Sequence, residues 1–176
     1  LANMSAKGKR VSVSPNKKGI LVLSSALGSY IVSLVGLTIL LIFLKFILHV
    51  EFGNQWFYII ILSLVGNLAG ISMGIFIASV FRVSEQAKTG INIAISMFFS
   101  VLSGMMGVTL KYIIDKNMPI VNLINPNNLI TDGFYALYYY NTFDRYVRDI
   151  CFLGIFIFVC LLISFIALRR EQYDYL

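Results

Sequence analysis

Residues 20–44 read ILVLSSALGSYIVSLVGLTILLIFL, and this uncharged stretch decides the class of fold. A helix needs about 20 mainly apolar residues to cross the hydrocarbon core of a bilayer. No charged residue occurs from Gly19 to Leu44, so the stretch is long enough to cross. It therefore predicts a transmembrane helix at about residues 19–48, in which Lys45 and His49 extend to the far interface.

The composition of the whole chain agrees with a membrane protein. Hydrophobic residues make up 59% of the 176 residues and charged residues 12%, with a mean hydropathy of +0.84. Ordinary soluble domains contain about twice this share of charged residues. A chain of this length holds about four spans and no separate soluble catalytic domain. We therefore expect an all-α polytopic membrane protein with four transmembrane helices.

Three further apolar runs supply the other spans. The second, at about residues 56–81, begins with the aromatic residues Trp56, Phe57 and Tyr58, which suit the headgroup level. The third, at about residues 89–110, follows a polar connection in which Ser84 can cap the next helix. The last, residues 150–168, is closed by Arg169 and Arg170.

Residues 111–149 contain mixed polar and apolar sequence that fits no span. Asn125 can cap a helix whose first residue is Pro126, because proline fixes a helical φ and lacks the donor that this position cannot use. The residues that follow predict an amphipathic helix with Asp132 on its polar face. We expect a re-entrant or interfacial element here, on the extracytoplasmic side.

The positions of the basic residues predict the orientation. Nine Lys and Arg residues lie in the N-terminal segment, the 82–88 connection and the C-terminal tail, and four lie in residues 111–148. Basic residues concentrate on the cytoplasmic side, so residues 1–18 and the tail 169–176 are both expected in the cytoplasm. The net charge of +6 follows this topology and does not form a phosphate-binding stripe, so no nucleic-acid partner is expected.

Small residues recur at intervals of four in two spans. Gly66, Gly70 and Gly74 do so in the second, and Ser96, Ser100 and Gly104 in the third. Small residues on one helix face let helix backbones approach closely. Packing within one protomer is the commoner use of such a pattern, and contact with a second subunit is the alternative.

Asn67 and Asn92 lie inside otherwise apolar spans. An amide facing lipid is unfavourable by on the order of 1 kcal/mol or more, so both should face protein or a wet cavity. Hydrogen bonding between helices is the more common role. The alternative is a substrate path, to which Ser96 and Ser100 would also contribute.

Catalytic motifs are missing from the sequence. It contains one histidine and no HExxH, GxSxG or GxxxxGK[ST] pattern. Cys151 and Cys160 are nine residues apart, on opposite faces of one helix, and cannot form a disulfide with each other. We expect no catalytic residue, metal site or cofactor, and the lack of a carboxylate deep in the spans argues against transport driven by protons or sodium.

Several segments in order resemble the C-terminal half of a bacterial ABC-2 type transporter permease. They are GKRVSVSPNKK before the first span, NLAGISMGIFIASVF in the second, SGMMG at the end of the third, INPNNLITDGFYALYYYNTFDRYVRD, and the closing LRRE. The first residue is Leu1, and the resemblance implies that two spans and most of a coupling helix precede the four spans.

The resemblance also implies the protein's function and partners. It implies the transmembrane subunit of an ATP-driven exporter in the bacterial cell membrane, paired with a separate ATPase subunit and a second permease subunit, the latter identical or different. Contact with the ATPase would involve residues near the coupling helix, namely Lys9, Arg10, Ser12, Ser14 and Pro15. These residues equally fit the simpler role of orienting the first span. A membrane scaffold or sensor subunit that transports nothing is the alternative function.

Overall fold

A computed structural model describes residues 18–50, 55–139 and 143–170, and these ranges are helical without any strand. Within these ranges, three helices contain segments long and apolar enough to cross a membrane, Leu23–Phe46, Trp56–Val80 and Asp144–Leu168, and a bent pair of helices supplies a fourth if it counts as one span. The chain is therefore an all-α polytopic membrane protein, as the sequence predicts. Its elements are α2 (Lys18–Phe46), α3 (Trp56–Val80), α4 (Glu85–Ser100), the π-helix η1 (Val101–Met105), α5 (Val108–Asn117), α6 (Pro119–Ile124), α7 (Pro126–Tyr139) and α8 (Asp144–Arg170).

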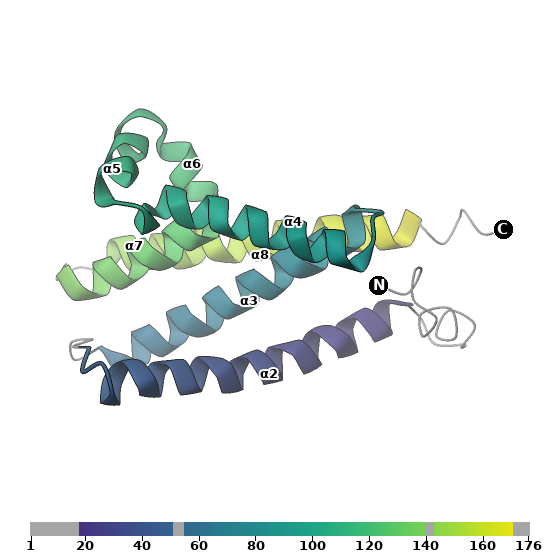
Figure 1. The fold of residues 1–176 in the computed structure, drawn as a ribbon, viewed down its shortest axis with the longest axis horizontal. Helices are drawn as coiled ribbons and strands as arrows, with labels where there is room; N and C mark the ends of the chain where they lie inside the picture. The colour runs from purple at the N-terminus through teal and green to yellow at the C-terminus, as the bar shows by residue number, and fades with distance from the viewer. Residues whose placement is uncertain (1–17, 51–54, 140–142, 171–176) are drawn as a thin grey trace.

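Helices α3 and α8 form the centre of the bundle, and α7 packs against both (Figure 1). Helix α2 lies on the outside and packs mainly against α3. The start of α2, the connection from α3 to α4 and the end of α8 all lie at one end of the bundle (Figure 1). The end of α2, the start of α3 and the start of α8 lie at the other end, where α5 and α6 project to one side.

The buried core lies where α3, α7 and α8 meet. Tyr146 of α8 belongs to it and donates a hydrogen bond of 2.8 Å to the backbone oxygen of Tyr58. Outside this core, large apolar side chains are exposed along α2 and α8, as is normal for helices that face lipid. The other core residues are Ile59, Leu62, Ala69, Leu129, Ala136, Leu137, Leu153 and Ile157.

The third predicted span is not one continuous helix. The expected helix over residues 89–110 ends as α4 at Ser100, passes into a π-helical turn, and continues as α5 after a bend of 95°. Gly104 has φ +101° and Gly107 has φ +144°, which are backbone conformations that glycine adopts easily. This break was not predicted from the apolar run, because hydropathy does not report backbone geometry.

The helix ends show which local predictions hold. Ser84 accepts a hydrogen bond of 3.3 Å from the Ala87 amide, so the predicted cap of α4 is confirmed. Helix α7 starts at Pro126 after Asn125, also as predicted. Helix α8 begins at Asp144, before the expected start at residue 150, because polar residues form its first turns outside the apolar run.

Candidate functional site

The start of the amphipathic helix α7 is held by Asn125, whose side chain is fully buried. Its Oδ1 accepts from the Asn127 and Asn128 amides at 3.0 and 3.3 Å, which satisfies two free donors of the first turn. Its Nδ2 donates to the Phe99 oxygen at 2.8 Å and to the Ser103 hydroxyl at 3.1 Å. One side chain therefore caps α7 and joins it to α4 and the π-helical turn.

Asn127 makes a second link between α7 and α4. Its Nδ2 donates to the Ser96 oxygen at 3.1 Å and to the Ser100 hydroxyl at 2.8 Å. Ser96 and Ser100, which the sequence suggested as path residues, thus lie in the contact between α4 and α7. Asn92 is half-buried one turn earlier on α4. None of these three residues lines the cavity described below.

A cluster of charged residues joins α5, α7 and α8. Lys111 is buried, donates to the Asn128 Oδ1 at 2.7 Å, and lies 3.7 Å from the Asp132 carboxylate. Arg148 bridges the Asp132 and Asp149 carboxylates at 3.0 and 2.8 Å. Two positive and two negative charges therefore balance within the cluster. The Asp149 side chain is fully buried, and its Oδ2 has no hydrogen-bond partner among the described residues.

Only part of this cluster was predicted from the sequence. Asp132 was expected on the polar face of the amphipathic helix, whereas Lys111, Arg148 and Asp149 were included only in the mixed region 111–149 at the edges of the apolar runs. Charged residues at the edge of an apolar run usually face water, so this interpretation follows the common case. The signal available in the sequence was that acidic and basic residues both occur in this region. Which of them pair depends on how α5, α7 and α8 fold together.

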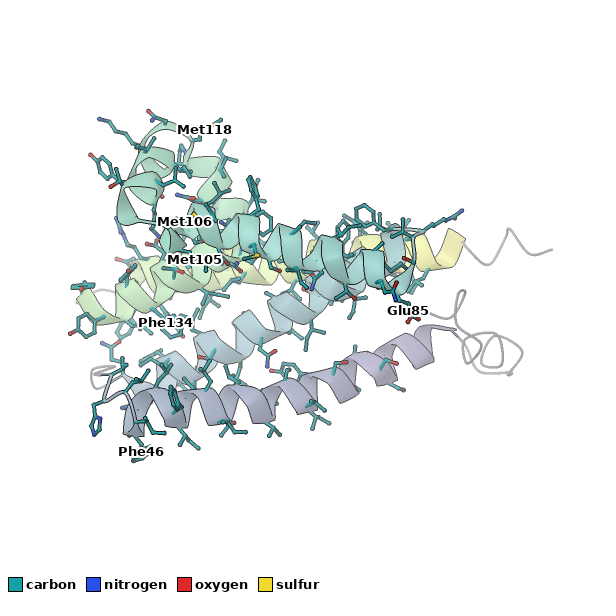
Figure 2. All side chains as sticks on the ribbon, viewed as in Figure 1. Phe46, Glu85, Met105, Met106, Met118 and Phe134 are labelled. Atoms are coloured by element: carbon teal, nitrogen blue, oxygen red, sulfur yellow. The ribbon has the colours of Figure 1, made fainter. Side chains whose placement is uncertain are left out.

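A cavity of about 900 Å³ lies between α2, α3 and α7. Helices α2 and α7 both pack against α3 but hardly against each other, so they form two walls of the cavity. Small residues line the cavity on both helices, namely Ser33 and Gly36 on α2 and Ser63 and Gly66 on α3. Phe134, labelled in Figure 2, contributes from α7. This volume is within the range of small-molecule sites.

Asn67 is the proposed path residue that does line this cavity. It is half-buried, and its Nδ2 has no hydrogen-bond partner among the described residues. An unsatisfied buried amide is unfavourable by about 1–3 kcal/mol, so such a group calls for an explanation. The cavity, with Asn67 in its wall, is therefore the candidate functional site.

The four glycines of the proposed packing set lie in different surroundings. A Cβ on Gly66 would come within 2.9 Å of Ile130, so α3 and α7 approach closely there. Gly70 and Gly74 have open space around them. Gly104 lies at the break in the third span, where its backbone conformation matters more than its size. The small-residue pattern therefore marks an internal contact at Gly66 and a free helix face at Gly70 and Gly74.

The proposed ATPase-contacting residues Lys9, Arg10, Ser12, Ser14 and Pro15 lie outside the described residues. Within the described ranges, no group of three or more His, Cys, Asp or Glu side chains could hold a metal ion. Cys151 is exposed and Cys160 is buried, and both are free thiols. The features on which a function can be built are therefore the cavity and the polar contacts that position α7.

The described helices surround a cavity, and they include a broken span and a capped helix before the last span. This arrangement defines a polytopic α-helical membrane protein. The sequence model of the family described as ABC-2 family transporter protein matches residues 4–166. The chain belongs to this family, which bears out the resemblance seen in the sequence. Searches of curated proteins and of solved structures found no match.

Proposed function

We propose that the chain is the transmembrane permease of an ATP-driven exporter in the bacterial cell membrane. The family assignment supports a permease of an ABC transporter that works with an ABC ATPase subunit. The observation that carries the proposal is the cavity between α2, α3 and α7, because a transport protein needs a space among its helices for cargo. ATP hydrolysis takes place in the partner chain, and the permease changes the access to the cavity as that ATPase closes.

The charges and the arrangement of the helices support an orientation in the membrane. The start of α2, the α3–α4 connection and the end of α8 lie together at one end of the bundle (Figure 1), and the basic segments of the sequence flank these points. On the positive-inside rule, we propose that this end lies in the cytoplasm, with both termini of the sequence. Lys9, Arg10, Ser12, Ser14 and Pro15 would then lie on the side where a cytoplasmic ATPase binds.

A second permease subunit, identical or different, completes the proposed transporter. Gly70 and Gly74 present an open small-residue face on α3, and such faces permit close approach of a second helix. Gly70→Leu should reduce the association of permease subunits, measured by cross-linking in native membranes. Gly28→Leu places the same side chain in open space on α2 and serves as the matched control.

Co-purification tests the proposed coupling. The chain, isolated from its native membrane in a mild detergent, should carry an ATPase subunit that hydrolyses ATP. Transport should stop when ATP is withheld. A preparation without any ATPase, or transport that continues without ATP, would contradict the proposal.

A scaffold or sensor subunit without transport is the second candidate, favoured by the use of Ser96 and Ser100 in packing. Bulky apolar substitutions discriminate between the two functions. Asn67→Leu should reduce transport while the ATPase still co-purifies, because the larger side chain adds bulk to the wall of the cavity. Asn92→Leu and Ser96→Leu test two of the other proposed path residues. Variants that lose assembly, with no loss of transport in the complexes that still assemble, would favour the scaffold.

A further inference from the structure

We propose that the cavity between α2, α3 and α7 binds the alkyl chain of a membrane amphiphile, with the head group at the tyrosine-lined end. The inference names a class of cargo for the proposed permease, so in that respect it rests on the proposed function.

Among the described residues, the lining of the cavity is mainly apolar and carries no charge. Leu37, Leu40 and Leu44 cover its α2 wall. The Ser33 hydroxyl already donates to the Tyr30 backbone oxygen at 2.9 Å and is not free to donate to a ligand. Apolar cavities do not hold water well, and an alkyl chain would supply the missing van der Waals contacts.

A peptide fits this lining poorly. Each peptide unit brings a donor and an acceptor that must be satisfied when it leaves water. Besides the tyrosines at one end, the polar side chains that line the cavity within the described ranges are Ser33, Ser63 and Asn67. Three such side chains cannot satisfy an extended backbone, whereas an alkyl chain needs no hydrogen bonds.

The length of the cavity matches one leaflet of a bilayer. Its α2 wall runs from Ser33 to Leu44, which at about 1.5 Å per residue is about 16 Å. Half of a hydrocarbon core about 30 Å thick is about 15 Å. A single lipid tail, entering from one leaflet, would therefore fill the cavity along its length.

The outer end of the cavity suits a polar head group. Tyr138 and Tyr139 line this end and are exposed, and tyrosine is enriched where the apolar core of a bilayer meets water. Lys45 follows the last lining residue of α2, and its Nζ lies 4.3 Å from the centre of the Trp56 ring. An ammonium group at this level favours a head group that contains a phosphate.

Gly36 offers a variant that fills the cavity without disturbing the fold. It lines the cavity, and a Cβ there would meet no atom within 4 Å, so a leucine side chain has room to occupy the space. Gly28 on the same helix is equally open but does not line the cavity. Gly36→Leu and Gly28→Leu therefore add the same bulk to α2 inside and outside the proposed site.

Photolabelling of the full transporter in phosphatidylcholine vesicles tests the site. The probe is lysophosphatidylcholine with a photoreactive diazirine near the end of its acyl chain. Adducts should form at the deep end of the cavity, on Leu37 and Asn67. Gly36→Leu should lower this labelling several-fold and Gly28→Leu should leave it unchanged. Equal labelling in both variants, or adducts confined to lipid-facing residues such as Val32, would overturn the proposal.

Failure of the alkyl-chain site and failure of the proposed function give different results. A complex that contains an active ATPase but shows no labelling of the cavity would remove the alkyl-chain site and leave the permease function standing. Labelling that depends on Gly36 in a preparation without ATPase would support the site and contradict the coupled permease.

Discussion

Asn125 illustrates how one side chain positions a whole helix. It is buried, caps α7 through its oxygen, and reaches α4 and the π-helical turn through its nitrogen. Asparagine suits this place because its amide both accepts and donates. An aspartate would keep the cap and lose the two donated bonds.

Asn125→Ala should lower the stability of the protein by about 2–4 kcal/mol, because a lost cap is worth about 1 kcal/mol and an unsatisfied buried group about 1–3 kcal/mol. Unfolding by sodium dodecyl sulfate in mixed micelles measures the change. Asn125→Asp keeps the accepting oxygen but loses the donated bonds and buries a carboxyl group against the Phe99 oxygen, so it should be destabilised as well. If Asn125→Ala unfolds like the wild type, the anchoring role is excluded.

Arg148 forms an ion pair with the buried Asp149 carboxylate. Arg148→Gln should destabilise the protein by about 2 kcal/mol, less than the roughly 3–5 kcal/mol expected for a fully buried pair, because Arg148 is 45% exposed. The double variant Arg148→Gln/Asp149→Asn should recover part of this loss, since no uncompensated charge stays buried. The same unfolding assay compares them, and additive effects would show that the pair is not coupled.

At the scale of elements, the broken third span determines where α7 can lie. Helix α4 stops near the middle of the bundle, and α7 runs from that point to the end where α8 begins (Figure 1). The break depends on Gly104, with φ +101°, and on Gly107. An unbroken helix through residue 110 would separate Asn125 from Phe99 and Ser103.

Gly104→Ala should therefore destabilise the protein by about 1–2 kcal/mol, because a Cβ is strained in the left-handed region. Gly90 lies in the regular part of α4 with open space around it, so Gly90→Ala should be neutral or stabilising by up to about 1 kcal/mol. Thermal unfolding in detergent compares the two variants. The same response from both would mean that the break does not depend on the glycine.

The sequence predicted those parts of the fold that depend on local patterns. Long apolar runs located α2, α3 and α8, and single residues located two helix starts, at Ser84 and Asn125. The break at Gly104 was not predicted, because a glycine inside an apolar run is compatible with a continuous helix. Of the proposed path residues, only Asn67 lines the cavity. Tertiary packing decides which helices face each other. The sequence pattern of a single span does not specify this packing.

At the scale of the whole molecule, the orientation in the membrane can be measured directly. Gln86 lies at the start of α4, and Met118, which is labelled in Figure 2, lies between α5 and α6. Each is replaced by cysteine in a separate variant, Gln86→Cys and Met118→Cys. In a background with Cys151→Ala and Cys160→Ala, an impermeant maleimide should label Met118→Cys in intact cells. It should label Gln86→Cys only after permeabilisation, and the reverse pattern would invert the proposed topology.

The central claim is that the walls of the cavity move when the partner ATPase binds ATP. Spin labels at Ile42 of α2 and Tyr138 of α7 would report the distance across the cavity by double electron–electron resonance. Ile42 and Tyr138 are 53% and 55% exposed, so both positions accept a label. In the native complex, trapping the ATPase with ATP and vanadate should shift the distance distribution. An unchanged distribution in a complex that hydrolyses ATP would contradict the account and favour a scaffold.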